Sequence, residues 1–369
     1  MIKRSFIREI LDAITPEMIS FAGGLPDEGL FPKDALADAA QAALQNPASL
    51  QYGGTQGNLQ LRQAIARRYS EKGMATTPEE ILVTTGSQQG ITLAALAHFR
   101  SGLLVESPLY LGAKGVFEYF GIDTLPVPFN REGIDLNMLA QKGREGLWAY
   151  LVPDFHNPTG RRYDRKHREG AAKLLKEKGM FLAEDGAYES LYFDSPMPSI
   201  ASTIPDHSLH LGSFSKILAP GMRVGWVRGS KNLLVPMIAV KERIDLHTSS
   251  LDQAIIAHYL ADNDLEAHLK GLRQAYKKKM ETMADILEEE LPGFLFQRPA
   301  GGMFIYGKLA GVDASQLVRE CMKEGVVFVP GVEFGDPEKG SIRFNFSHAD
   351  PERIRAGMRT IRRIAETRR

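Results

Sequence analysis

The stretch EEILVTTGSQQGITLAALAHF, residues 79–99, joins two different patterns of apolar residues. Its beginning is a short apolar run that ends in two threonines, which is typical of a buried strand. A glycine turn follows, and the remaining residues carry apolar side chains at the spacing of a helix. The stretch therefore predicts a strand, a tight turn and a helix, the repeating unit of α/β proteins.

The same alternation continues along the middle of the chain. We expect further strands at 102–108, 146–153, 180–185, 208–215 and 223–230, and helices at 110–121 and 164–179. Strands that alternate with helices favour a mostly parallel sheet with helices on both faces. From about residue 246 the pattern changes to one long helical segment, then short strands and helices, which indicates a smaller α+β domain.

These patterns divide the chain into three parts. We expect an N-terminal arm and part of the small domain at 1–46, a large domain at 47–245 and the small C-terminal domain at 246–369.

Composition excludes several classes of protein. The 369 residues include 45 basic and 45 acidic side chains, so the formal net charge is zero and nothing favours nucleic acid or an anionic membrane. Cys321 is the only cysteine, which rules out a disulfide within the chain and disfavours a cysteine-based metal site. No apolar run has the length of a membrane span. We expect a cytoplasmic protein without a metal, a nucleic-acid partner or a membrane partner.

Four polar segments follow predicted strands, and each has an ordinary explanation when taken alone. They are TTGSQQG at 84–90, HNPTG at 156–160, AEDGAYESLYF at 183–193 and SFSKILAPGMR at 213–223. A capped helix start, a turn, an N-cap and a surface lysine would account for them one by one. Because ligands bind at the carboxyl ends of strands in open α/β sheets, we expect all four segments to line one crevice.

Two of the segments suit a phosphate and an aldehyde. Ser87 and Gln88 begin a helix, whose N-terminal N–H groups favour anions. Lys216 stands beside positive charge and in partly apolar surroundings, which lowers the pKa of an amine and makes it a nucleophile. A plausible anion cradle beside it consists of Ser213, Ser215 and Arg223.

The other two segments suit a protonated aromatic ring. Asp185 ends a predicted buried strand, where a carboxylate needs a cationic partner such as a ring nitrogen. Asn157 and Tyr188 supply an amide and a phenol for a ring hydroxyl. A phosphate cradle, a nucleophilic lysine and these ring contacts are the protein groups that pyridoxal 5'-phosphate requires.

The chain resembles the fold type I, pyridoxal-phosphate-dependent aminotransferases of class I/II. It is most similar to the branch with 2-aminoadipate aminotransferase and kynurenine aminotransferase II, which also supplies a domain of MocR-type regulators. The resemblance covers nearly the whole chain and includes ISFAGGLPDEGLFP, LQYGGTQGNLQLR, the four segments above, DLHTSSLDQ, GGMF and SIRFNF in the family's order. It implies a large domain with a mostly parallel seven-stranded sheet between helices, and a smaller α+β domain.

The resemblance also implies a role for each residue of the crevice. Lys216 would bind the cofactor covalently and move a proton to and from the substrate, with Asp185 and Tyr188 as its catalytic partners. Asp185 would keep the ring nitrogen protonated, Asn157 and Tyr188 would bind the ring hydroxyl, and Tyr110 would stack on the ring. The phosphate would be held by Ser87, Gln88, Ser213, Ser215 and Arg223.

Further positions imply substrate contacts and a second subunit. Arg343 and Asn157 would bind the substrate α-carboxylate, and Gly24 would lie beside the substrate. Tyr52 resembles the tyrosine that reaches the phosphate of the neighbouring subunit, which implies a homodimer. Arg8 falls where this branch recognises a distal carboxylate, although it could equally be a surface arginine.

Two positions depart from the branch. His156 stands where glutamine is frequent, and Gly186 stands where a second acidic residue is frequent. Neither carries the chemistry outlined above, and neither is given a role from the sequence.

The leading interpretation is an aminotransferase with a ping-pong mechanism. The donor would be an L-amino acid of the 2-aminoadipate, aromatic or branched-chain type, and the acceptor a 2-oxo acid such as 2-oxoglutarate. One alternative is a lyase that uses the same cofactor, because fold does not fix function. Another is a MocR-like sensing domain, ranked lower because the family-like region starts close to Met1.

Overall fold

A seven-stranded sheet forms the centre of the larger part of the molecule. The structure is a computed structural model, and it describes residues 14–130, 132–348 and 350–367. The order of the strands is β2 (Ile81–Thr84), β8 (Gly225–Gly229), β7 (Ser208–Ser213), β6 (Phe181–Asp185), β5 (Trp148–Leu151), β3 (Leu103–Ser107) and β4 (Thr124–Pro128). Only β8 runs antiparallel to its neighbours, β2 and β7. This confirms the predicted mostly parallel sheet.

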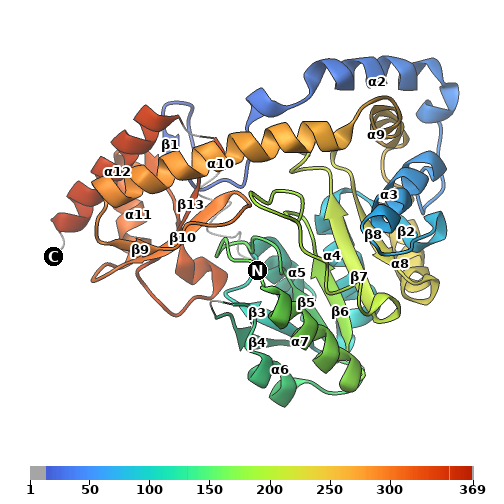
Figure 1. Cartoon of the computed structure of the whole chain (residues 1–369), viewed down its shortest axis with the longest axis horizontal. Helices are drawn as coiled ribbons and strands as arrows, with labels where there is room; N and C mark the ends of the chain where they lie inside the picture. Colours follow the sequence, from blue (N-terminus) through green and yellow to red (C-terminus); the bar gives the residue numbers. More distant parts are fainter. Residues whose placement is uncertain (1–13, 131, 349, 368–369) are drawn as a thin grey trace.

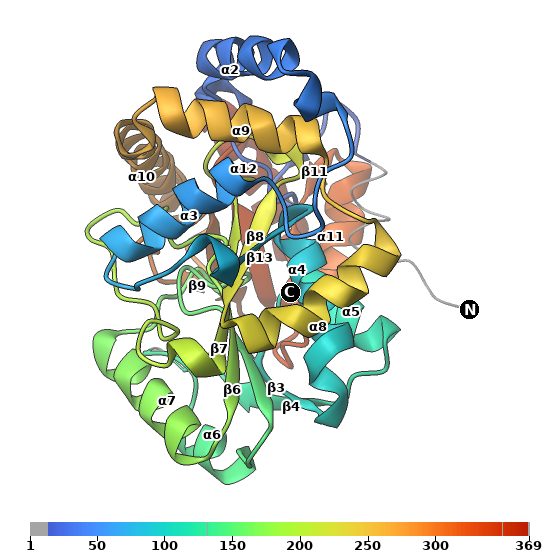
Figure 2. The same ribbon diagram turned by 90° about the vertical axis from the view of Figure 1, so that its right-hand side faces the viewer.

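Helices cover both faces of the sheet (Figures 1 and 2). One face packs against α4 (Gly86–His98), α5 (Leu111–Tyr119) and α8 (Lys231–Ile244). The other packs against α3 (Leu59–Glu71), α6 (Leu136–Lys142) and α7 (Arg165–Glu177). Successive strand residues face opposite ways, so Leu104 and Val105 enter different apolar clusters. Apolar strands buried on both faces are what a covered parallel sheet requires.

The smaller part contains a four-stranded antiparallel sheet. Its order is β12 (Val329–Pro330), β13 (Ser341–Asn345), β10 (Phe304–Leu309) and β9 (Phe294–Phe296). The helices α10 (Leu265–Glu290), α11 (Ala314–Lys323) and α12 (Pro351–Glu366) accompany it. Side chains of Asp264, Asp313 and Asp350 cap the first turns of these three helices.

The beginning of the described chain lies against this smaller part. β1 (Ile19–Ser20) pairs in parallel with β11 (Val326–Val327). After β1 the chain passes to α2 (Lys33–Gln45), which packs on α9 (Ser250–Asp262), and α9 also packs on α3. The domain limits at 46/47 and 245/246 stay a prediction. Within the described residues, no helix combines the length and the apolar character needed to cross a membrane.

Candidate active site

A cavity of about 600 Å³ opens at the carboxyl ends of the central strands. It lies where parallel α/β sheets place their ligands. Its lining includes Gly24, Ser87, Gln88, Tyr110, Asn157, Asp185, Tyr188, Ser213, Ser215, Lys216, Arg223 and Arg343. The structure thus brings together the residues that the sequence predicted for one crevice, except Tyr52 and Arg8.

Lys216 follows β7 and points its amine across the cavity. Its Nζ donates a hydrogen bond to the Gly24 carbonyl oxygen at 2.7 Å. Burial, together with the positive charges of Arg223 and Arg343, lowers the pKa of Lys216 to about 8. An amine with this pKa is partly neutral near physiological pH, and the neutral form is the one that attacks an aldehyde.

Asp185 ends β6 with its carboxylate in the cavity wall. Tyr150 of β5 donates its hydroxyl to Oδ2 at 2.6 Å, and the Ala187 N–H donates to Oδ1 at 3.1 Å. Burial raises the pKa of Asp185, while these two hydrogen bonds oppose the rise. Within residues 14–130, 132–348 and 350–367, no lysine, arginine or histidine forms an ion pair with Asp185. A cationic ring nitrogen in the cavity would therefore give this buried carboxylate its missing partner.

An anion cradle forms where Arg223 meets the first turn of α4. The Arg223 Nη1 lies 3.4 Å from Ser215 Oγ, and the Ser215 N–H donates to Ser213 Oγ at 3.1 Å. Gly86 begins α4 with φ at +72°, and a Cβ there would stand 2.6 Å from Arg223 Nη2. Only glycine lets the guanidinium lie against this helix start, where free backbone N–H groups favour an anion.

Gln88, another side chain predicted for the phosphate, makes a different contact. The Gln88 amide donates from Nε2 to the Gly112 carbonyl at 2.8 Å, and its Oε1 lies 3.4 Å from the Tyr110 hydroxyl. Gln88 therefore ties α4 to the start of α5 and to Tyr110. Its predicted contact with the phosphate stays a prediction.

Arg343 of β13 reaches the cavity from the smaller part of the molecule. Its Nη1 donates to Asn157 Oδ1 at 2.8 Å, and its Nη2 donates to the Ala22 carbonyl. The guanidinium lies 4.4 Å from the Phe304 ring centre, and burial lowers its pKa to about 10. Its Nε has no hydrogen-bond partner among the described residues. A carboxylate entering the cavity would satisfy this group.

Asn157 and Tyr188 lie on the same wall as Arg343. Burial raises the pKa of Tyr188, and a hydrogen bond with Asn157 opposes the rise. The side-chain oxygen of Asn157, Oδ1, accepts a hydrogen bond from Arg343. The side-chain NH2 group of Asn157 can therefore donate to other groups. A ring hydroxyl in the cavity could use both side chains.

Two predicted residues lie elsewhere. Tyr52 is 80% exposed and sits in a separate shallow hollow, with its ring centre 5.8 Å from that of His247. It makes no part of the cavity of its own protomer. Arg8 lies outside the described residues, so its predicted role stays a prediction.

Sequence patterns gave no role to several residues that support the cavity. The sequence predicts Tyr150 only as part of an apolar strand. A tyrosine buried in a strand needs a hydrogen-bond partner for its hydroxyl, and this requirement was the signal that pointed to a polar neighbour. His156 is buried below Asn157, with its Nε2 3.4 Å from Glu106 Oε2, and burial lowers its pKa to about 3. Glu106 in turn accepts from the Tyr163 hydroxyl at 2.6 Å. Within the turn that carries Asn157, His156 Nδ1 lies 3.0 Å from Thr159 Oγ1, a contact that supports this turn.

Comparison with known proteins settles the family. The model of the class I and II aminotransferases matches residues 16–361. The chain belongs to this family. A 2-aminoadipate transaminase of Thermus thermophilus is 35% identical over 98% of this chain and 94% of its own. An aromatic-amino-acid aminotransferase of Thermococcus litoralis is 32% identical over 99% of this chain and 91% of its own.

A solved structure extends the likeness to the fold. LysN, an α-aminoadipate aminotransferase from Thermus thermophilus complexed with N-(5'-phosphopyridoxyl)-L-leucine, has 34% identity and a TM-score of 0.90, covering 99% of this chain and 95% of its own. Helix-turn-helix transcriptional regulators also match this chain.

Membership of this aminotransferase family confirms four predictions from the sequence. They are the family itself, the type I fold, pyridoxal phosphate as the cofactor, and amine transfer as the reaction. The cavity fits that cofactor, because a phosphate cradle, a nucleophilic lysine and a buried carboxylate without a cation line the same space. The role of each residue stays a prediction.

Proposed function

We propose that this aminotransferase takes the amine of an L-amino acid and gives it to a 2-oxo acid, with 2-oxoglutarate as the acceptor. The observation that carries the proposal is the position of Lys216. Its amine has a lowered pKa and shares one cavity with the Arg223 cradle and with Arg343. A cofactor anchored at the cradle and a substrate anchored at Arg343 would meet at this amine.

Lys216 would act first as a nucleophile and then as a proton carrier. When bound, pyridoxal phosphate supplies an electron-withdrawing ring that stabilises the charge left when the substrate loses its α-proton. The Lys216 amine would take this proton and return it at a neighbouring atom. The Gly24 carbonyl, which accepts from Nζ at 2.7 Å, gives the protonated amine a resting position.

Arg343 would fix the substrate by its α-carboxylate. Its planar guanidinium can bind a carboxylate with two parallel hydrogen bonds, which a lysine cannot do. Asn157 Oδ1 and the Ala22 carbonyl hold the guanidinium in place. Asp185 would keep the ring nitrogen protonated, and Tyr150 would hold Asp185 toward it.

The wall left for the substrate side chain is apolar among the described residues. Leu25 and Leu111 line the cavity. The charged groups that line it are Asp185, Lys216, Arg223 and Arg343, and each already has a proposed partner. Leucine-like and aromatic donors would fit this wall directly, while a 2-aminoadipate-like donor needs a further cation, for which we propose Arg8.

We also infer that the working enzyme is a cytoplasmic homodimer that serves amino-acid biosynthesis. Tyr52 is 80% exposed and lies outside the cavity of its own protomer. An exposed tyrosine beside other exposed apolar side chains, such as Leu50, fits a surface that a second copy covers. Tyr52 of the partner subunit would then reach the phosphate.

A donor panel tests the proposed reaction. The protein with pyridoxal phosphate is incubated separately with glutamate, 2-aminoadipate, leucine and phenylalanine, each with a suitable 2-oxo acid acceptor, and the new amino acid is measured. We expect turnover with at least one donor of these classes. Release of ammonia without a new amino acid would instead support the lyase, and no change with any donor would support a sensing domain.

A further inference from the structure

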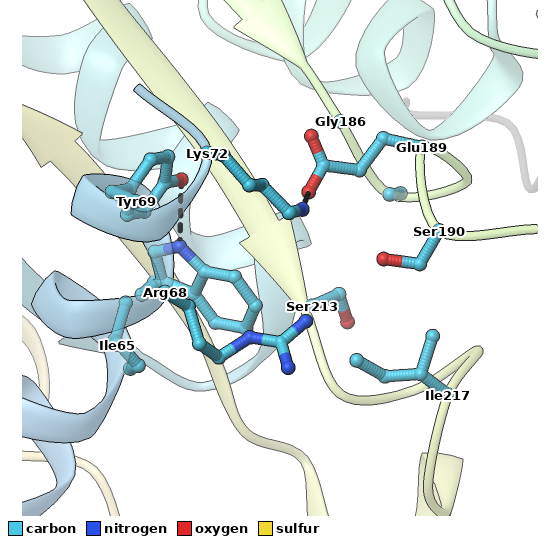
Figure 3. Close-up of a pocket in the computed structure, with 11 residues that line it drawn as sticks. Ile65, Arg68, Tyr69, Lys72, Gly186, Glu189, Ser190, Ser213 and Ile217 are labelled. Atoms are coloured by element: carbon cyan, nitrogen blue, oxygen red, sulfur yellow. Dashed lines mark hydrogen bonds and ion pairs between the residues drawn. The ribbon is translucent and has the colours of Figure 1, made fainter. Parts of the chain in front are cut away.

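A polar cluster of Tyr69, Lys72, Glu189 and His210 lies directly behind the proposed ring site. Tyr69 belongs to α3, Lys72 follows the end of that helix, and Glu189 belongs to the turn after β6 (Figure 3). His210 of β7 completes the cluster and is 1% exposed. The hollow between these elements holds about 20 Å³ and shares Ala187 and Ser213 with the cavity. Because that space fits about one water molecule, it is no ligand site.

The turn after β6 presents side chains on two sides. Asp185 and Tyr188 line the cavity. Glu189 lines the small hollow instead, and its side chain points toward Lys72 (Figure 3). The Glu189 N–H donates to the Gly186 carbonyl at 3.1 Å, which closes the turn. Whatever holds the Glu189 carboxylate therefore also orients the two residues proposed to contact the cofactor ring.

Two basic side chains, Lys72 and His210, contact the Glu189 carboxylate. Lys72 Nζ lies 2.7 Å from Oε1, and His210 Nε2 lies 3.4 Å from Oε2. Lys72 is 50% exposed and His210 is buried, so the carboxylate bridges the surface and the sheet interior. Burial raises the pKa of Glu189, but Lys72 and His210 lower it more, so the group stays ionised.

The His210 ring is fixed from its other side. Its Nδ1 lies 2.6 Å from the Tyr69 hydroxyl, which accepts the indole N–H of Trp226 at 2.9 Å. A protonated His210 directs its Nδ1–H to the Tyr69 hydroxyl oxygen and its Nε2–H toward Glu189. The Tyr69 hydroxyl on one ring nitrogen and the Glu189 carboxylate 3.4 Å from the other set the direction of the ring.

The ring also packs against the backbone next to Asp185. A Cβ on Gly186 would stand 2.5 Å from His210 Cε1 and 2.7 Å from Nε2. No side chain larger than hydrogen fits there while His210 is in place. This contact gives a physical reason for glycine at a position where the related branch frequently has an acidic residue.

Charge links the cluster to Asp185. Burial lowers the pKa of His210, but Glu189 and Glu184 raise it more, so the net direction is upward. Burial raises the pKa of Asp185, and the positive charge at His210 opposes that rise. Arg68 lines the same hollow, and Arg228 acts on Tyr69 from β8.

We propose that His210, held by Tyr69 and Glu189, is a positioning residue that keeps the 185–189 turn oriented so that Asp185 and Tyr188 face the cofactor ring. The inference rests on the roles proposed above for Asp185 and Tyr188. It adds a site behind the ring, in which Lys72 anchors Glu189, Glu189 orients His210, and His210 supports the backbone that follows Asp185.

Glu189→Gln tests this inference, with Glu290→Gln as the matched control. Glu290 also binds two cations, Arg355 and Arg359, but lies between α10 and α12. Both variants are titrated with pyridoxal phosphate, and the visible band of the bound cofactor is followed against pH. A protonated nitrogen in the cofactor ring would lower the pKa of the lysine nitrogen bonded to the cofactor. If Asp185 is held less firmly, it should keep the ring nitrogen protonated less well. The pH midpoint of the visible band should then rise.

We expect Glu189→Gln to raise this midpoint by about one pH unit and the cofactor Kd by about tenfold, while Glu290→Gln changes neither. Tyr69→Phe should raise the midpoint and the Kd as well, and Tyr276→Phe, which removes another buried hydroxyl, serves as its control.

If Glu189→Gln does not fold, Tyr69→Phe provides the test of the inference. An unchanged midpoint and Kd in a folded cluster variant would overturn the inference. Absence of any visible band in the unaltered protein would instead overturn the proposed role of Lys216.

Discussion

Replacing Gly86 by alanine tests the phosphate cradle in a way that separates backbone strain from lost binding. Gly86 has φ at +72°, and the added Cβ would stand 2.6 Å from Arg223 Nη2. A side chain in left-handed backbone costs about 1–2 kcal/mol of folding stability. The guanidinium must also move, which removes a charge-assisted contact to the phosphate worth about 1.5–3 kcal/mol. Since about 1.4 kcal/mol is tenfold in affinity, the cofactor Kd should rise by about ten- to one-hundred-fold.

Gly146→Ala is the matched control for this experiment. Gly146 has φ at +74°, but a Cβ there meets nothing within 4 Å. Both variants should lose similar stability in thermal unfolding, whereas only Gly86→Ala should bind pyridoxal phosphate more weakly in a spectral titration. Equal cofactor Kd values for the two variants would refute the assignment of Arg223 and the start of α4 to the phosphate.

Three further changes test the remaining groups. Lys216→Ala should abolish transamination and the covalent visible band, and full turnover by this variant would contradict its role. Tyr150→Phe removes a donor at 2.6 Å from Asp185, so the pKa of this carboxyl should rise further. In a plot of kcat/KM against pH, the acid limb should then move to higher pH. An acid limb that does not move would show that Tyr150 does not set the pKa of Asp185. Arg8→Ala should raise the KM for 2-aminoadipate more than for leucine, and equal changes would show that Arg8 does not read a distal carboxylate.

The pH dependence of cofactor capture follows from Lys216. Its pKa of about 8 lies below the ordinary lysine value of 10.5. The apoprotein therefore holds less of the reactive neutral amine below pH 8, and its rate of cofactor binding should rise as pH passes through that value. By linkage, the unfolded chain binds more protons between these two pKa values, so Lys216 costs stability below pH 8 and the cost disappears toward pH 10.5. Rapid-mixing absorbance measurements check the rate.

Much of the fold could be predicted because apolar periodicity is a local property. The stretch around β2 and α4 shows both periods within 21 residues, and the structure has the strand at Ile81–Thr84 and the helix at Gly86–His98. The grouping of Lys216, Asp185 and Asn157 could also be predicted, because each stands at or after the end of a strand and the strand ends meet at one edge of the sheet. Their roles remain to be tested.

The contacts of the residues that support the cavity could not be predicted from the sequence. They depend on which strands are neighbours, on the register between them and on the face of the sheet to which each side chain points. Tyr150 reaches Asp185 only because β5 lies next to β6. Gly86 and Arg223 are 137 positions apart, and their contact depends on where β8 crosses the start of α4. Glu189 looks like a surface acid in the sequence, yet its carboxylate meets His210 behind the cavity.

The central claim is that the Lys216 amine bonds covalently to the cofactor. The protein loaded with pyridoxal phosphate is reduced with borohydride, digested and analysed by mass spectrometry to locate the pyridoxyl group. We predict that the group is found on Lys216 and that it is absent when an accepted amino donor is added before reduction. A pyridoxyl group on another lysine, or none on a protein that still transaminates, would contradict the account.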